Sequence, residues 1–276
     1  MKRRWIGLGF FFLLYLSGYS QVDNDKGFIS VALGPSFPLG DYASKDLENV
    51  YAGYAGIGEF VNISYSRLIG KYFGFSAALH GQRNPLNTRE LEKDFSTLKI
   101  NTGGIWAGPT PFPPPTLPFT YTLYPDWKFE KDAWLSGSFL LGGYGQFPFQ
   151  KRNNISFTEK AMLGVIYVSS PGLNGSSITD TATARVEQDG STGFGMAWSL
   201  YGGLKFDKGK KLFLSAGLEC SGSNKIKFKD IKSTITTTKG SPGSPGYSAQ
   251  QTTVTVDGKQ NINSLNFYIG IGLRLL

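Results

Sequence analysis

The chain has 276 residues, a formal net charge of +8 and a single cysteine, Cys220. This length suits one large domain or two small ones, and one cysteine excludes an internal disulfide. No long apolar run follows Gln21, which excludes a helical membrane protein. Without Lys2, Arg3 and Arg4 the charge falls to +5, too small an excess to indicate a nucleic-acid-binding protein.

The first twenty residues have the pattern of a secretory signal peptide. A basic start is followed by an apolar run at residues 5–16, which is too short to span a bilayer as a helix. Gly18 and Ser20 then form a small-x-small cleavage site. We expect residues 1–20 to be removed on export, leaving residues 21–276 as the mature domain; an N-terminal membrane anchor is the alternative.

Alternating side chains predict the first strands of the mature chain, because a period of two places successive residues on opposite faces. In the first strand Ile29, Val31 and Leu33 share one face, and small or polar residues share the other. The first four strands are expected at about residues 27–39, 55–68, 72–82 and 133–147.

Four more strands are expected at about residues 156–168, 193–206, 212–222 and 265–276. The fifth strand has the weakest alternation, because Glu159 and Lys160 interrupt it. The last strand has the clearest pattern. Its bulky face consists of every second residue from Leu265 to Leu275, and its other face includes Gly270 and Arg274. Glycines and a tyrosine on the second face suit a crowded interior better than a water-facing surface.

The connections alternate between long and short, and the short ones follow the second, fourth and sixth strands. This rhythm is typical of an even-numbered outer-membrane barrel with short periplasmic turns and long extracellular loops. Aromatic residues beside the short turns indicate an interfacial girdle: Tyr72, Phe73, Phe147, Phe149 and Phe206. A sheet in hydrocarbon must close on itself, so the last strand is expected to pair with the first.

The predicted fold class is therefore all-β: an eight-stranded antiparallel transmembrane up-and-down β-barrel with long extracellular loops. A soluble exported β-sandwich is the rival fold. Residues 34–41 (GPSFPLGD) and the closing strand at residues 268–276 resemble the first and last strands of the small outer-membrane β-barrel family of Gram-negative bacteria, which is OmpA/OmpX-like in architecture. The resemblance covers the mature chain at the level of pattern. It implies a location in the outer membrane and a shared fold rather than a shared activity.

An eight-stranded barrel has an interior just wide enough for side chains to fill it. Burying Glu219 unpaired would be costly, so we expect this carboxylate to meet trapped water or a cation. His80, Lys205 and Arg274 are the possible partners, and we interpret the four residues as a structural polar cluster in the lumen. Other polar candidates for the interior are Asn62, Ser76, Ser199 and Asn266.

No catalytic site, metal site or cofactor is predicted. His80 is the only histidine, and Ser76 lies four residues away in the same strand, roughly 13 Å along it, which is too far for a catalytic pair. One histidine, one cysteine and scattered acids give no metal-ligand spacing. We expect Cys220 to act as a small hydrophobic residue on the lipid side.

The longest connection, at about residues 83–132, combines prolines with aromatic rings. Such a segment is expected to be stiff and extended, with exposed rings. It is predicted either to dock a partner or to fold over the barrel mouth as a lid. The aromatic residues concerned are Trp106, Phe112, Phe119, Tyr121, Tyr124 and Trp127.

Two further connections are expected on the same side. Residues 171–192 are predicted to be a polar loop. The connection before the last strand is predicted to be an outward hairpin with its tip at residues 240–246 and its return at residues 252–256. Lys225, Lys227 and Lys229 share one face of this hairpin, where they either pair with anionic lipid head groups or form a solvated edge.

These observations together predict an exported outer-membrane protein that is not an enzyme. Its expected role is structural or interactive, through its extracellular loops, alone or within a larger outer-membrane assembly. The expected partners are outer-membrane lipid, lipopolysaccharide and a protein or glycan. The alternatives are a small pore or channel and a barrel enzyme that acts on lipid or peptide.

Overall fold

A computed structural model describes residues 27–46, 49, 51–97, 99–101, 121–123, 126–149, 152–180, 182–208, 211–240 and 247–275. The expected signal peptide lies outside these residues. Within them, no helix is long and apolar enough to cross a membrane.

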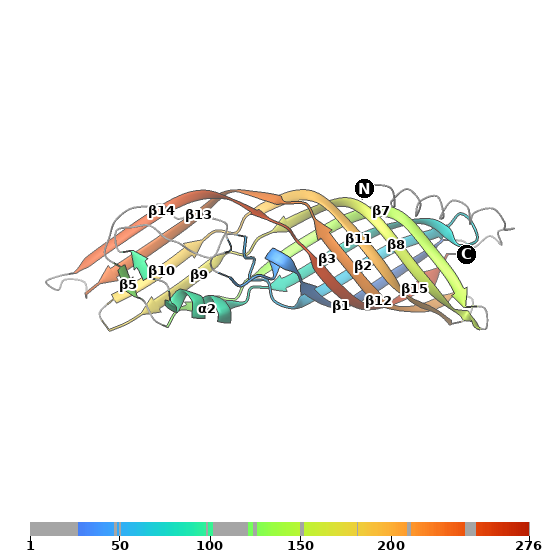
Figure 1. Cartoon of the computed structure of the whole chain (residues 1–276), viewed down its shortest axis with the longest axis horizontal. Helices are drawn as coiled ribbons and strands as arrows, with labels where there is room; N and C mark the ends of the chain where they lie inside the picture. The colour runs from blue at the N-terminus through green and yellow to red at the C-terminus, as the bar shows by residue number, and fades with distance from the viewer. Residues whose placement is uncertain are drawn as a thin grey trace, which may run out of the picture.

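Eight strands form a closed antiparallel barrel (Figure 1). They are β1 (Phe28–Pro38), β2 (Gly58–Leu68), β3 (Phe73–Pro85), β7 (Ala133–Phe149), β8 (Arg152–Ser169), β11 (Thr192–Lys208), β12 (Leu212–Ser223) and β15 (Ser264–Arg274). The order around the barrel is β1-β15-β12-β11-β8-β7-β3-β2. The first and last strands pair along their length, so that Phe28 lies opposite Arg274 and Pro38 opposite Ser264. The predicted fold class, including this closure, is confirmed.

The barrel has its apolar side chains outside. On β15, Phe267, Ile269 and Ile271 are exposed, whereas Tyr268 and Gly270 between them are buried. The same alternation holds on β11, where Trp198 points outward and Ser199 is fully buried. In a soluble sandwich the bulky apolar side chains would be buried and the small or polar ones exposed. The opposite arrangement seen in this barrel is the one that a bilayer requires.

Aromatic rings gather at the short turns of the barrel. Tyr72 stacks on Phe147 with ring centroids 5.8 Å apart, and Phe73 meets Phe147 edge to face at 5.6 Å. Phe149 and Phe206 are exposed beside the second and third turns. Rings at this level match the boundary between acyl chains and head groups.

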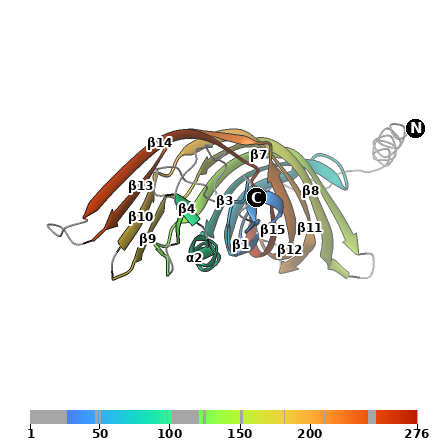
Figure 2. The same ribbon diagram turned by 60° about the vertical axis from the view of Figure 1, so that its left-hand side comes forward.

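The long connections fold into a structure of their own on the opposite side, which we call the cap. It consists of η2 (Gly40–Tyr42), α2 (Thr88–Thr97), a five-stranded sheet of order β14-β13-β10-β9-β6, and a two-stranded sheet of β4 (Lys99–Asn101) and β5 (Tyr121–Leu123). The larger sheet contains β6 (Lys128–Phe129), β9 (Leu173–Ile178), β10 (Ala182–Gln188), β13 (Ile226–Lys239) and β14 (Ser248–Gln260). It curves outward beyond the barrel (Figure 2).

The cap confirms one expectation about the connections and corrects another. The predicted outward hairpin is present as β13 and β14, and residues 241–246 of its predicted tip (240–246) lie outside the described residues. The prediction of a loop at residues 171–192 is wrong, because this segment forms the strands β9 and β10. These strands depend on a contact between distant segments: β10 pairs with β13, and Ala184 and Val186 are buried.

One hydrophobic core joins the cap to the barrel. Trp134, at the start of β7, meets Tyr42 at 5.6 Å and Phe228 at 5.9 Å between ring centroids. Its indole N–H donates to the carbonyl oxygen of Gly53 at 2.9 Å. The same cluster continues into the lumen through Leu140 and other inward residues of the barrel. The cap is therefore packed onto the mouth of the barrel.

Candidate functional site

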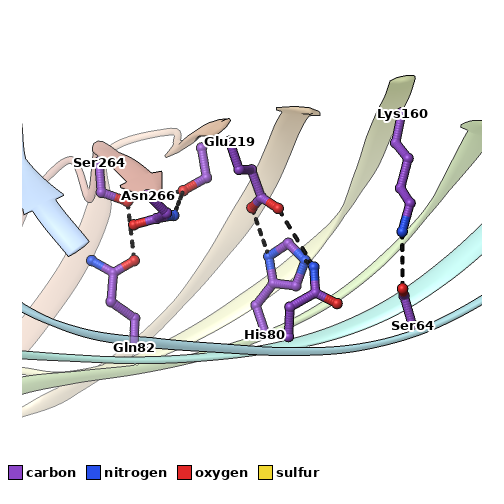
Figure 3. Close-up of polar contacts among 9 residues, drawn as sticks. Ser64, His80, Gln82, Lys160, Glu219, Ser264 and Asn266 are labelled. Carbon is purple, nitrogen blue, oxygen red and sulfur yellow. Dashed lines mark hydrogen bonds and ion pairs between the residues drawn. The ribbon is translucent and has the colours of Figure 1, made fainter. Parts of the chain in front are cut away.

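A polar cluster crosses the middle of the lumen (Figure 3). The Nδ1 atom of His80, on β3, lies 3.2 Å from Oε1 of Glu219, on β12. The amide nitrogen of Asn62, on β2, donates to Nε2 of His80 at 3.0 Å and contacts Oε2 of Glu219 at 3.5 Å. The imidazole of His80 therefore lies between the amide group of Asn62 and the carboxylate of Glu219. All three side chains are buried.

Lys160, on β8, extends the cluster toward the short-turn side. Its ammonium group donates to Oγ of Ser64 at 2.9 Å and lies 5.6 Å above the ring of Tyr201. Ser64 is in turn hydrogen-bonded to Ser30 at 2.9 Å. The sequence pattern does not identify Lys160 as a lumen residue, because it lies where the alternation of the fifth strand is weakest.

Lys205 and Arg274 do not reach Glu219. Nζ of Lys205 lies 3.7 Å from Oδ1 of Asp207, and Nη2 of Arg274 lies 2.8 Å from Oδ2 of the same carboxylate. The ammonium group of Lys205 also donates to Gln146 at 3.1 Å. The four residues predicted as one cluster therefore form two. The sequence pattern places Asp207 in a turn, although continuing the alternation by two residues from Lys205 would have placed it inside.

Aromatic side chains fill the lumen between and beside the polar groups. Phe28 packs edge to face on Tyr144 and Phe213, with centroids 5.4 and 5.1 Å apart. Tyr201 stacks on Tyr268 at 5.1 Å. Two cavities within the lumen measure about 20 Å³ each, which is room for roughly one water molecule.

The polar groups of the lumen join side chains of different strands. Nε2 of His80 accepts from Asn62, and Nδ1 faces the carboxylate of Glu219, so both ring nitrogens are directed at neighbouring strands. Ser76 donates to the carbonyl oxygen of Tyr65 at 3.0 Å and pairs with Ser66 at 2.9 Å. In the part of the chain that the structure describes, no group of three potential metal ligands comes together.

The predicted aromatic docking segment is only partly described. Trp106, Phe112, Phe119 and Tyr124 lie outside the described residues, as does the side chain of Tyr121. Trp127 is described, and the expectation of an exposed ring is wrong for it, because its side chain is 1% exposed. The indole packs between Phe95, at 5.2 Å, and Phe129, at 5.7 Å, under α2. A large apolar ring gains more from this core than from water.

The cap has a polar outer surface. Lys227 and Lys229 are exposed on β13, and Lys227 lies directly opposite Lys259 of β14. Lys225 instead places its ammonium group 4.5 Å above the ring of Tyr51. Two exposed lysines opposite each other repel, so this face is built for water or for an anionic partner.

A buried tyrosine ties α2 to the rest of the cap. The hydroxyl group of Tyr54 donates to Oδ2 of Asp94 at 2.8 Å. Burial of the ring, together with this acceptor, raises the pKa of Tyr54 well above its usual value of 10. The phenol is therefore neutral under physiological conditions and acts as a hydrogen-bond donor.

No family model and no curated protein match the chain. Among solved structures, it is similar to Neisserial surface protein A, with 10% identity and a TM-score of 0.40 over 90% of this chain and 97% of that one. It is also similar to a major outer membrane protein from Thermus thermophilus, with 10% identity and a TM-score of 0.39 over 90% and 99% of the chains. At such low similarity, the strand pairing described above is what establishes the barrel.

Proposed function

We propose that this protein is an outer-membrane barrel that serves as a rigid base for an interaction surface outside the cell. One observation carries the proposal: the lumen is filled, whereas the long connections fold into an ordered sheet packed on the barrel mouth. An ordered sheet outside a closed barrel suits the binding of a partner better than the passage of a solute through the lumen.

The location in the outer membrane is supported by the apolar belt and by the expected signal peptide. Closed barrels satisfy all their backbone hydrogen bonds within lipid, and small barrels of this kind belong to outer membranes. The start of β1 and the end of β15 lie on the side of the short turns, because Phe28 pairs with Arg274 there. This topology would place the short turns in the periplasm and the cap outside.

The contact surface proposed for a partner is the outer part of the β13–β14 hairpin. β14 is the last strand of the sheet, so one of its backbone edges has no neighbouring strand among the described residues. Its side chains near the tip are exposed and polar, among them Gln250, Gln251 and Thr253. An exposed strand edge with polar side chains suits an extended protein segment that adds to the sheet.

The pore alternative has less support. A conducting barrel needs a continuous water-filled passage, and the lumen is interrupted by Tyr201, Tyr268 and the pair of His80 and Glu219. We expect the purified protein to give no steady conductance in planar bilayers. An ohmic current from the unmodified protein would favour the channel.

The orientation can be tested with two epitope insertions. One epitope is placed between β13 and β14, after Lys239, and the matched control is placed in the turn between β11 and β12, after Lys208. Antibody should label intact cells that carry the first insertion and should label the second only after the outer membrane is opened. Recovery of the protein in the periplasm, without a heat-dependent shift in gel mobility, would overturn the proposal.

A further inference from the structure

The lipid-facing wall of the barrel has a hollow on the cap side. Most outward positions carry bulky apolar side chains, but Gly81 of β3 and Gly137 of β7 both point outward and lie directly opposite each other. Val61 flanks this pair on β2 and Tyr167 flanks it on β8. The two glycines line a groove of about 1070 Å³, whose walls also include Leu33 and Leu135.

A cationic side chain stands at the upper rim of this groove. Arg83 is the next outward residue along β3 after Gly81 and is exposed. Its neighbours in register are Glu59 on β2 and Leu135 on β7. Its guanidinium group makes no hydrogen bond or ion pair with any residue in the described ranges, including Glu59. An arginine beside lipid is costly unless an anion meets it.

In the proposed orientation, the groove would lie at the boundary between acyl chains and head groups. Tyr167, which forms one wall, packs against the exposed ring of Phe194 with centroids 4.8 Å apart. Exposed aromatic pairs on the outside of a barrel sit at this boundary. Below it, the apolar hollow has the shape and polarity for an acyl chain. Above it, Arg83 is placed to meet a phosphate group.

We propose that this groove binds lipid A, the phosphorylated glycolipid of the outer leaflet, with one acyl chain against Gly81 and Gly137 and a phosphate on Arg83. The inference rests on the proposed orientation, which turns the cap side outward and so exposes the groove to the outer leaflet. The guanidinium group of Arg83 and the level of the groove favour this occupant over a neutral lipid, and Glu59, which also lines the groove, opposes it.

The test uses the full mature protein, freed of lipid in detergent and titrated with defined lipids under native mass spectrometry. The probes are bisphosphorylated lipid A, the same lipid A without phosphates, and phosphatidylethanolamine. We expect retention of the bisphosphorylated form to exceed that of either other lipid by about tenfold, as one charge-assisted contact would give. Equal retention of all three lipids would overturn the proposal.

Two substitutions separate the two halves of the groove. Gly137→Leu should fill the hollow and weaken binding of both forms of lipid A; its Cβ would find its nearest neighbour, the carbonyl oxygen of His80, at 3.9 Å, so the barrel should fold. Arg83→Gln should remove only the preference for phosphate, and Glu59→Gln should strengthen it. The matched controls are Gly143→Leu, an outward glycine with nothing within 4 Å, and Arg67→Gln near the opposite rim.

Each control should bind like the unmodified protein. If Gly137→Leu and Arg83→Gln also do so, the groove does not bind this lipid. Failure of the orientation is recognised separately, because the epitope insertions report it without any lipid-binding measurement.

Discussion

Glu219 of β12 and His80 of β3 meet across the barrel, with Oε1 3.2 Å from Nδ1. These strands are four positions apart whichever way the closed sheet is followed, so the pair spans the full width of the lumen. A contact of this reach fixes the register of two strands that never hydrogen-bond to each other. The same contact obstructs the lumen. The groups that stabilise the barrel are therefore also the groups that fill its interior.

The first prediction concerns this pair. His80→Ala should lower the free energy of unfolding in lipid vesicles by about 1–3 kcal/mol, because the buried carboxylate of Glu219 loses the imidazole and keeps its contact with Asn62. The double variant His80→Leu with Glu219→Met should recover most of this loss, because it removes both polar groups together. Urea titration followed by tryptophan fluorescence measures both. A single variant as stable as the unmodified protein would show that the pair does not hold the strands.

Two adjacent glycines of β7 provide the second prediction. A Cβ at Gly142 would collide with the carbonyl oxygen of Ala161 and lie 2.6 Å from Cα of Met162, whereas one at Gly143 would meet nothing within 4 Å. Gly142→Ala should therefore cost about 1–3 kcal/mol, because backbone must move. Gly143→Ala should stay within about 0.5 kcal/mol. Equal stabilities in the same urea titration would contradict the close approach of β7 and β8.

The third prediction compares two isoleucines that are each 72% exposed: Ile269, in the middle of β15, and Ile178, on β9 of the cap. Ile269→Arg should cost about 2–4 kcal/mol in vesicles, because an arginine replaces an apolar contact with lipid. Ile178→Arg should be nearly neutral, because that position faces water. Unfolding in vesicles measures both variants, and a similar cost at the two sites would argue against a lipid belt around β15.

The fourth prediction concerns Trp127 in the cap core. Trp127→Ala should lower the free energy of unfolding of the cap by about 3–5 kcal/mol, because the indole is buried between Phe95 and Phe129. The cap should become sensitive to protease while the barrel keeps its heat-dependent gel mobility. The matched control is Trp198→Ala, which removes an outward ring of the barrel wall. A variant at Trp127 that resists protease like the unmodified protein would contradict the packing.

Alternation along the chain was sufficient to predict the eight barrel strands, the inward and outward faces of all but the fifth, and the pairing of β1 with β15. These features follow from a local period of two, and from the demand that no backbone group remain unpaired in lipid. Residues such as Ile269 and Gly270 carry this information in their own side chains.

The partners inside the lumen and the fold of the cap depend on contacts between distant segments. Whether Glu219 meets His80 or Arg274 is set by the tilt and register of strands on opposite walls, which no local pattern records. Lys160 turns inward because β7 and β11 hold β8 in register, despite its weak alternation. The strands at residues 173–188 and the burial of Trp127 likewise exist because β13 and α2 supply the surfaces that cover them.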